Sequence, residues 1–328
     1  LPPESGLDRG FDVWDTALIG DATAITSDPV TDAAIAWVED EEPQPFLMFL
    51  FYMDPHYAYM EQPGKMLPEP GALVQPGQDI WELRDRLPHL KDDDLNTLRA
   101  LYAGEVRAFD RAVGRLVRWL KETDRYENTF FLITSDHGEQ LGEREWIGHT
   151  RNLHAELLDV PLIIAGRKWL EPELRNDPAA LIDIYPTVLQ LLGLAPMPLP
   201  GRGLFSPDRP DRALYSEVTF DPQVIPNQSD PARNVLRARE LTKIADQRAV
   251  QQGRWKLIRN RLTDTWQLFD RETDPGETQD LSGAHPAVVD ALQGSFPEPG
   301  SFEVPEEETV RGISEDEITR LRNLGYVN

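Results

Sequence analysis

One segment limits the fold of this chain more than any other, because residues 46–53 (FLMFLFYM) are apolar or aromatic throughout. A strand with one wet face alternates apolar and polar residues, whereas a strand that is apolar at every position needs cover on both faces. A membrane-spanning helix takes about 20 apolar residues, and no run in the sequence approaches that length. We therefore expect a buried strand, of the kind found in the parallel sheets of α/β proteins.

The segments on either side alternate between predicted helices and predicted strands. In chain order they are a short helix at residues 31–39, a long amphipathic helix from Leu95 to Leu120, strands at residues 129–134 and 160–165, and a helix at residues 184–192 with Asp183 as its N-cap. Such alternation predicts an α/β sandwich built on a mainly parallel sheet.

The last third of the chain has a different character. A stretch rich in Pro and Gly, residues 195–210, precedes short predicted strands with turns between them. These strands are expected at residues 215–218, 249–252, 255–259 and 266–270. Consecutive short strands favour an antiparallel sheet. The sequence thus predicts one domain at residues 1–210 and a C-terminal subdomain at residues 211–328.

Charge and cysteine content exclude several classes of function. The net charge of −24 disfavours nucleic-acid binding, since phosphates are repelled by an acidic surface. An anionic substrate would need a local positive centre such as a metal ion. The chain has no cysteine, which removes disulfides, thiolate metal sites and a cysteine nucleophile within these residues.

The sharpest local feature is Ser135-Asp136-His137-Gly138-Glu139, directly after the predicted strand at residues 129–134. Open α/β sheets bind their ligands at the carboxyl ends of strands. A turn at this point lets Asp136 and His137 reach one divalent cation, and Gly138 permits a tight backbone. Taken alone, the same residues favour a turn that ends a strand, with a capping Asp.

The surrounding motifs resemble, in order, those of the sulfatase family of the alkaline phosphatase superfamily. Beside Thr134–Glu139 they are Gly6–Asp12, Met53-Asp54-Pro55-His56, Tyr102–Val106 with Gly114–Leu116, Gly148-His149, Leu158–Ile164, Asp183–Thr187 with Leu191–Gly193, Trp255–Ile258, Leu268–Asp270, Asp274–Glu277 and Leu321–Tyr326. The resemblance implies an alkaline-phosphatase-like sandwich with a small C-terminal antiparallel sheet.

The same resemblance implies a divalent metal site. In the family, two early Asp residues and a later Asp-Asn or Asp-His pair hold the ion, and Asp136 and His137 match the later pair. We expect Ca²⁺ first and Mn²⁺ second, because carboxylate oxygens suit both and a histidine ligand favours transition ions.

Two histidines match family residues that face the sulfate group. His56 matches the one that contacts the sulfate or assists departure of the leaving group, and His149 stands where members carry Lys or His. Arg151 is a further candidate for binding an anionic substrate. The histidine at position 154 is expected to pack in the interior, whereas His89 and His285 beside prolines are given no role.

The family nucleophile has no counterpart in the expected place. It is a Cys converted to formylglycine, or a Ser, within Cys/Ser-x-Pro/Ala-x-Arg, and it precedes every motif matched here. The string Ser229-Asp230-Pro231-Ala232-Arg233 fits this pattern, but it lies among the predicted C-terminal strands and is interpreted as a coincidence. The early Lys-x-His contact is also absent. We expect a fragment that lacks its N-terminal strands and is inactive until completed.

The predicted function is metal-dependent hydrolysis of sulfuric esters, with a small anionic substrate such as a sulfated carbohydrate. Two alternatives remain: a phosphodiester or phosphonate monoester hydrolase on the same scaffold, or a non-catalytic binding protein that retains the fold. Location is undetermined, although the resemblance favours the periplasm or secretion. No nucleic-acid partner and no transmembrane segment are expected in this chain.

Overall fold

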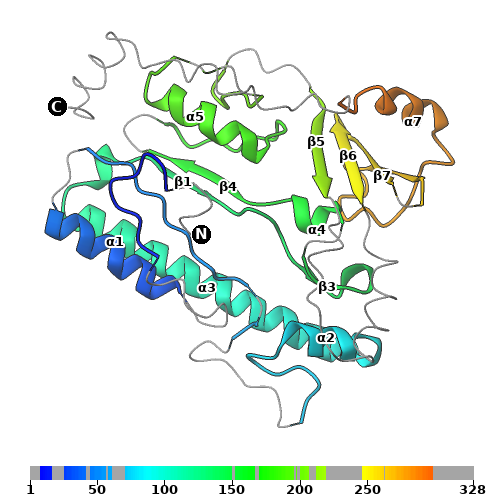
Figure 1. Ribbon diagram of the computed structural model, residues 1–328, viewed down its shortest axis with the longest axis horizontal. Helices are drawn as coiled ribbons and strands as arrows, with labels where there is room; N and C mark the ends of the chain where they lie inside the picture. The colour runs from blue at the N-terminus through cyan, green and yellow to red at the C-terminus, as the bar shows by residue number, and fades with distance from the viewer. Residues whose placement is uncertain are drawn as a thin grey trace.

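The computed structural model contains an N-terminal group of elements around one long helix and a C-terminal four-stranded sheet (Figure 1). The structure describes residues 8–16, 26–41, 45–56, 58–60, 71–149, 152–166, 170–195, 197, 200–206, 212–218, 246–261 and 263–297. Within them, no helix has the length and apolar character needed to cross a membrane.

The N-terminal group follows the predicted order of helices and strands. Its elements are α1 (Ser27–Glu41), α2 (Ile80–Arg86), η2 (Leu87–His89), α3 (Asp92–Glu122), η3 (Tyr126–Asn128), β1 (Phe131–Thr134), β2 (Gln140–Leu141), η4 (Glu143–Glu145), β3 (Ile147–Gly148), α4 (Ala155–Leu158), β4 (Leu162–Ala165), η5 (Leu181–Asp183) and α5 (Ile184–Leu191). The predicted helices at residues 31–39, 95–120 and 184–192 are thereby confirmed, as are the strands ending at Thr134 and Ala165.

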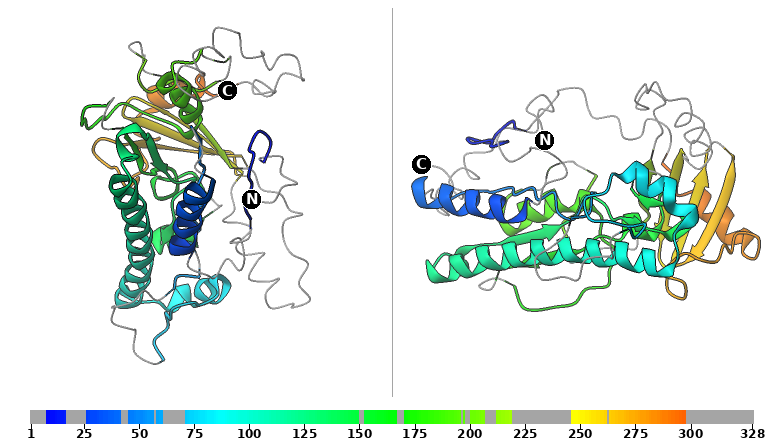
Figure 2. Two further views of the ribbon diagram at one scale, coloured as in Figure 1. Left: turned by 90° about the vertical axis from the view of Figure 1, so that its left-hand side faces the viewer. Right: turned by 90° about the horizontal axis from the view of Figure 1, so that it is seen from below.

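Helix α3 packs along α1, and the two lie side by side in every view (Figure 2). Three consecutive Asp residues, 92–94, open α3, where negative charge interacts favourably with the helix dipole. The apolar stripe of α3 buries Leu98, Leu101 and Ala112. On the solvent side Arg115 pairs with Asp28 and Asp32 of α1.

The predicted buried strand at residues 46–53 is wrong for the described part of the structure. Phe46–Met53 is extended, but it joins no ladder with other described residues. Alternate side chains point to water: Leu47, Phe49 and Phe51 are 72%, 58% and 37% exposed. The prediction assumed a sheet with cover on both faces, and the described residues do not supply one around this segment.

The predicted parallel sheet is not seen either, since all strand pairs among the described residues are antiparallel. Strand β1 pairs with β4, placing Phe131 opposite Ala165 and Thr134 opposite Leu162. The short strands β2 and β3 form a hairpin. The described N-terminal region is therefore α/β in content, with only short antiparallel ladders.

The predicted C-terminal antiparallel sheet is confirmed. It consists of β5 (Leu214–Val218), β6 (Gln247–Gln252), β7 (Trp255–Asn260) and β8 (Thr265–Asp270), in that order, and α7 (Pro286–Gln293) packs on it (Figure 1). One face buries Val250, Leu257 and Leu268 against α7, while Ile258 and Phe269 pack with Leu153 on the other face. The sheet thus has a core on both sides.

Asp183 begins α5 as predicted, but its carboxylate does not cap that helix. Its oxygens instead accept hydrogen bonds from the backbone N–H groups of Ala180 and Arg202, at 3.0 and 2.8 Å, and from the Arg212 side chain. Because this Asp is fully buried, the bonds tie together three segments that are distant in sequence.

Candidate active site

Three of the predicted site histidines lie together. The ring centroids of His137 and His149 are 4.1 Å apart, and those of His56 and His149 are 5.4 Å apart. His56 follows the extended segment, His137 follows β1, and His149 follows β3. The fold thus brings these residues to one place although up to 93 positions separate them in sequence; their chemical roles stay predictions.

The side chains of Asp136 and His137, the predicted metal ligands, lie close to each other. Asp136 Oδ2 and His137 Nε2 are 3.7 Å apart, which is within reach of one cation at about 2.0–2.6 Å from each. His137 Nδ1 lies 2.9 Å from the carbonyl oxygen of Gly138. A proton on Nδ1 donates to that carbonyl and leaves Nε2 with the lone pair that a metal needs.

These two residues fit only part of a metal site. Their side chains are 66% and 40% exposed, and in the part of the chain that the structure describes no group of three or more His, Cys, Asp or Glu side chains is arranged to hold a metal. Ca²⁺ takes six to eight oxygen ligands and Mn²⁺ also favours several donors. The described residues can therefore supply two protein ligands, one hard oxygen and one imidazole nitrogen.

The imidazole ring of His149 contacts a buried carboxylate through Nδ1. Its Nδ1 lies 3.0 Å from Glu139 Oε1, and both side chains are almost buried. The β2–β3 hairpin that carries it is fixed by Arg84, whose Nε donates to the carbonyl oxygen of Ile147 at 2.8 Å. Gly148 has a φ of +100°, and a Cβ on it would overlap the Arg84 side chain, so a side chain there would be both strained and obstructed.

The backbone around His56 is held by a second buried carboxylate. Glu105 of α3 accepts hydrogen bonds from the N–H groups of His56 and Met60, at 3.2 and 2.6 Å. Burial raises the pKa of Glu105 to about 8, and the negative charges of Asp54 and Glu139 contribute in the same direction. The side chain of Glu105 accordingly keeps its proton near neutral pH and adds no negative charge beside His56.

The third buried acidic residue in this region, Asp54, joins the extended segment to α1. It accepts hydrogen bonds from the N–H groups of Thr26 and Ser27, at 2.9 and 2.7 Å, and from the Ser27 hydroxyl. A carboxylate at a helix N-terminus satisfies N–H groups that have no partner within the helix. This capping role was not evident in the sequence, where Asp54 stood only as part of the motif around His56.

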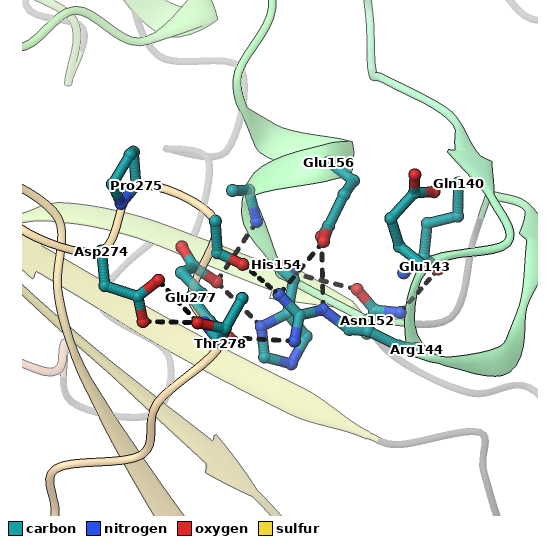
Figure 3. Close-up of polar contacts among 12 residues, drawn as sticks. Gln140, Glu143, Arg144, Asn152, His154, Glu156, Asp274, Pro275, Glu277 and Thr278 are labelled. Carbon is teal, nitrogen blue, oxygen red and sulfur yellow. Dashed lines mark hydrogen bonds and ion pairs between the residues drawn. The ribbon is translucent and has the colours of Figure 1, made fainter. Parts of the chain in front are cut away.

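A network of buried charges connects the region of the candidate site to the C-terminal sheet (Figure 3). The Glu277 carboxylate accepts from Lys256 Nζ at 2.7 Å, from His154 Nδ1 at 2.8 Å and from Arg271 Nη1 at 3.1 Å. The backbone N–H of Ala155 also donates to it. The contacts with His154 and Lys256 outweigh the effect of burial and lower the pKa of Glu277 to about 2.

An arginine of the β2–β3 hairpin contacts the backbone at Glu277 (Figure 3). Arg144 donates to the carbonyl oxygens of Glu277 and Gly276, at 3.0 and 2.9 Å, and forms an ion pair with Glu156 of α4. The hairpin that ends at His149 is therefore anchored to the C-terminal sheet. Residue 154 packs inside the structure as predicted, with its ring against Phe269, and also joins this network.

Other predicted residues fall outside this picture. Arg151 and Ser229–Arg233 lie outside the described residues. The sequence interpretation missed Glu139, Glu105 and Glu277 as residues of structural consequence. Each had been noted only as part of a longer motif. An acidic residue among small and apolar neighbours could have drawn attention to Glu105, but the neighbours of Glu139 and Glu277 gave no such signal.

Comparisons with known proteins agree on one class, the phosphate- and sulfate-ester hydrolases of α/β fold. A family model described as Sulfatase matches residues 11–194. Since this range covers more than half of the chain, the protein belongs to the sulfatase family, and with it to the alkaline phosphatase superfamily.

Individual relatives are distant and longer. Choline-sulfatase of Rhizobium meliloti (strain 1021) is 28% identical over 261 residues, which make up 74% of this chain and 48% of that protein. The chain spans less than half the length of curated relatives such as this one. Their activities therefore belong to longer proteins.

Solved structures confirm the fold. The phosphonate monoester hydrolase SpPMH from Silicibacter pomeroyi superposes with a TM-score of 0.61 at 23% identity, over 91% of this chain and 69% of that one. A protein designated BT4656, in complex with its substrate D-glucosamine-2-N,6-O-disulfate, superposes with a TM-score of 0.56 at 19% identity, over 82% and 68%. The alkaline-phosphatase-like α/β fold with a small C-terminal antiparallel sheet is thus established.

Proposed function

We propose that the chain forms part of a metal-dependent sulfuric ester hydrolase, active only when a further segment supplies the nucleophile. The observation that carries this proposal is the convergence of His56, His137 and His149 beside Asp136, in a member of the sulfatase family. Residues 1–210 would form the catalytic part and residues 211–328 the supporting subdomain.

Each residue of the site has a specific role in this proposal. Asp136 and His137 hold a divalent cation, Ca²⁺ or alternatively Mn²⁺, which when bound polarises the sulfate oxygens. His149 donates a proton to the leaving oxygen and His56 contacts the sulfate group. Arg151 is proposed to bind the anionic part of the substrate, for which a sulfated sugar is the leading candidate.

Exposure of the segment Phe46–Met53 supports the need for completion. Its backbone is extended and joins no ladder with other described residues, while alternate apolar side chains face water. Exposed strand edges of this kind pair readily with another strand. A neighbouring strand from a further segment would bury Leu47 and Phe49 and rebuild the predicted sheet.

The first test measures the metal site directly. Isothermal titration of the chain with CaCl₂ and with MnCl₂ should give weak binding, because two protein ligands hold a cation poorly. The Asp136→Asn variant should abolish the heat, whereas Glu171→Gln, at an exposed position of the same chain, should leave it unchanged. Equal binding by Asp136→Asn, or none by the parent chain, would contradict the proposed metal ligands.

The second test concerns completion and reaction class. The coding DNA on the 5′ side of the Leu1 codon should contain, in frame, Cys-x-Pro-x-Arg or its Ser equivalent; a stop codon followed by a start codon would contradict the catalytic proposal. The longer protein should hydrolyse 4-nitrophenyl sulfate faster than 4-nitrophenyl phenylphosphonate. The reverse order would favour a phosphonate monoester hydrolase, which Asp136 and His137 suit equally well.

A further inference from the structure

A carboxylate and an imidazole face each other in the interior beside the candidate site. Glu139 Oε1 lies 3.0 Å from His149 Nδ1, and the two side chains are only 5% and 10% exposed. Water is thus largely excluded from this contact. A hydrogen bond in such surroundings is stronger than one at the surface and holds its partners in one geometry.

The main chain around Glu139 is fixed on both sides. The N–H of Gly138 donates to the carbonyl oxygen of Leu157 at 2.9 Å, and a Cβ on that glycine would overlap the carbonyl oxygen of Glu156. On the other side Gln140 is completely buried and accepts from Asn152 Nδ2 at 2.9 Å. The backbone of Glu139, directly before β2, is therefore held on both sides.

The direction of this hydrogen bond selects one tautomer. An ionised carboxylate only accepts hydrogen bonds, so the proton of a neutral His149 must lie on Nδ1. The nitrogen that bears the lone pair is then Nε2, on the side of the ring away from Glu139. A free histidine side chain favours the Nε2–H tautomer instead. The carboxylate of Glu139 should therefore shift the tautomer of His149 measurably.

We propose that Glu139 is a positioning residue: it holds His149 in one orientation, as the Nδ1–H tautomer when neutral, and presents Nε2 to the ligand of the site. The proposal rests on the proposed function only for the identity of that ligand. It adds to the function a residue whose contact lies with the histidine and not with the substrate.

The test is nuclear magnetic resonance of the ¹⁵N-labelled chain, using two-bond ¹H–¹⁵N correlations of the histidine rings at a pH where His149 is neutral. Its signals are assigned by their loss in His149→Gln. The expected pattern is that of an Nδ1–H tautomer. In Glu139→Ala, the Nε2–H pattern should become the major one.

Two variants keep the test decisive. Glu139→Gln retains an acceptor oxygen at the same reach and should preserve the Nδ1–H pattern. Glu143 lies in the same hairpin, and its carboxylate accepts hydrogen bonds from Leu141 and Arg99. Glu143→Ala removes this carboxylate and should leave the tautomer pattern of His149 unchanged. An Nε2–H pattern in the parent chain, or no change in a folded Glu139→Ala, would overturn the proposal.

Titration of the same proteins with inorganic sulfate, at a lower pH where His149 is protonated and its Nε2–H can donate to the anion, separates this inference from the proposed function. Sulfate-dependent shifts of His149 that weaken at least several-fold in Glu139→Ala would support both. If the tautomer changes as expected but sulfate moves no histidine signal in any sample, the positioning role stands and the proposed sulfate site fails.

Discussion

Two glutamates with the same burial behave in opposite ways in the two halves of the molecule. Glu277 at the C-terminal junction and Glu105 of α3 are each only 1% exposed. The pKa of Glu277 is lowered to about 2, because His154 and Lys256 donate to its carboxylate and outweigh the effect of burial. That of Glu105 is raised to about 8, since only backbone N–H groups oppose the cost of burial.

The difference shows that burial alone does not decide the charge of a carboxyl group. Cations at the C-terminal junction keep Glu277 ionised and make it the centre of an interface. Beside the histidines, Asp54 and Glu139 add negative charge instead, and Glu105 keeps its proton. The same residue type thus serves as an ionic anchor in one half and as a neutral hydrogen-bonding group in the other.

Of the substitutions at Glu277, Glu105 and Arg115, Glu277→Gln should lower the free energy of unfolding most. Glu277→Gln leaves Lys256, which is only 2% exposed, without its carboxylate, and breaking a buried pair costs about 3–5 kcal/mol. Urea unfolding at pH 7, followed by circular dichroism, measures this loss. A change below about 1 kcal/mol would show that the junction contributes little to stability.

Acid should remove the contribution of Glu277 gradually. Since its folded pKa lies below the unfolded value of 4.5, the stabilisation is complete above pH 4.5 and is lost as pH falls through 2. The stability difference between the parent chain and Glu277→Gln should therefore shrink by about 3 kcal/mol between pH 5 and pH 2. A constant difference over this range, measured by urea unfolding, would mean that Glu277 is not ionised in the folded protein.

Glu105 should produce the opposite dependence on pH. Its folded pKa lies above the unfolded value of 4.5, so the folded state binds the extra proton and stability falls as pH rises from 4.5 to 8. In this pH range the free energy of unfolding should fall by at most about 1.4 kcal/mol per pH unit. Relaxation of the site should limit the total fall to about 2 kcal/mol.

Comparison with a variant isolates the Glu105 effect. Glu105→Gln cannot ionise, and its unfolding free energy should fall less between pH 5 and pH 8 than that of the parent chain. The loss of one acceptor oxygen lowers its stability at every pH, so the slope is the informative quantity. Parallel pH profiles for the two proteins would indicate an ionised Glu105.

The smallest effect is expected for an ion pair that water reaches. Arg115, on the same helix as Glu105, pairs with Asp28 and Asp32, whose side chains are largely exposed. Exposed pairs contribute about 0–1 kcal/mol. Arg115→Ala should therefore change the unfolding free energy by less than about 1 kcal/mol in thermal or urea unfolding, and raising the salt concentration should reduce even this effect. A larger loss would show that α1 depends on this pair for its docking.

Much of the fold could be predicted from local patterns. Apolar spacing placed α3 to within a few residues, and short β-rich segments between turns predicted the C-terminal sheet. The strand at residues 46–53 could not be judged in this way, because its burial depends on neighbours that a local pattern does not contain. For the same reason the antiparallel pairing of β1 with β4 was not predicted.

The candidate site could likewise be predicted only in part from the sequence. By itself, the sequence determined the family and marked Asp136, His137, His149 and His56, because motif order survives at low identity. Only the tertiary structure decided that the three histidine rings meet, and that Glu139 lies behind one of them. It also decided which buried carboxylates carry charge, since a pKa depends on the atoms that surround a group in space, and chain order does not specify those atoms.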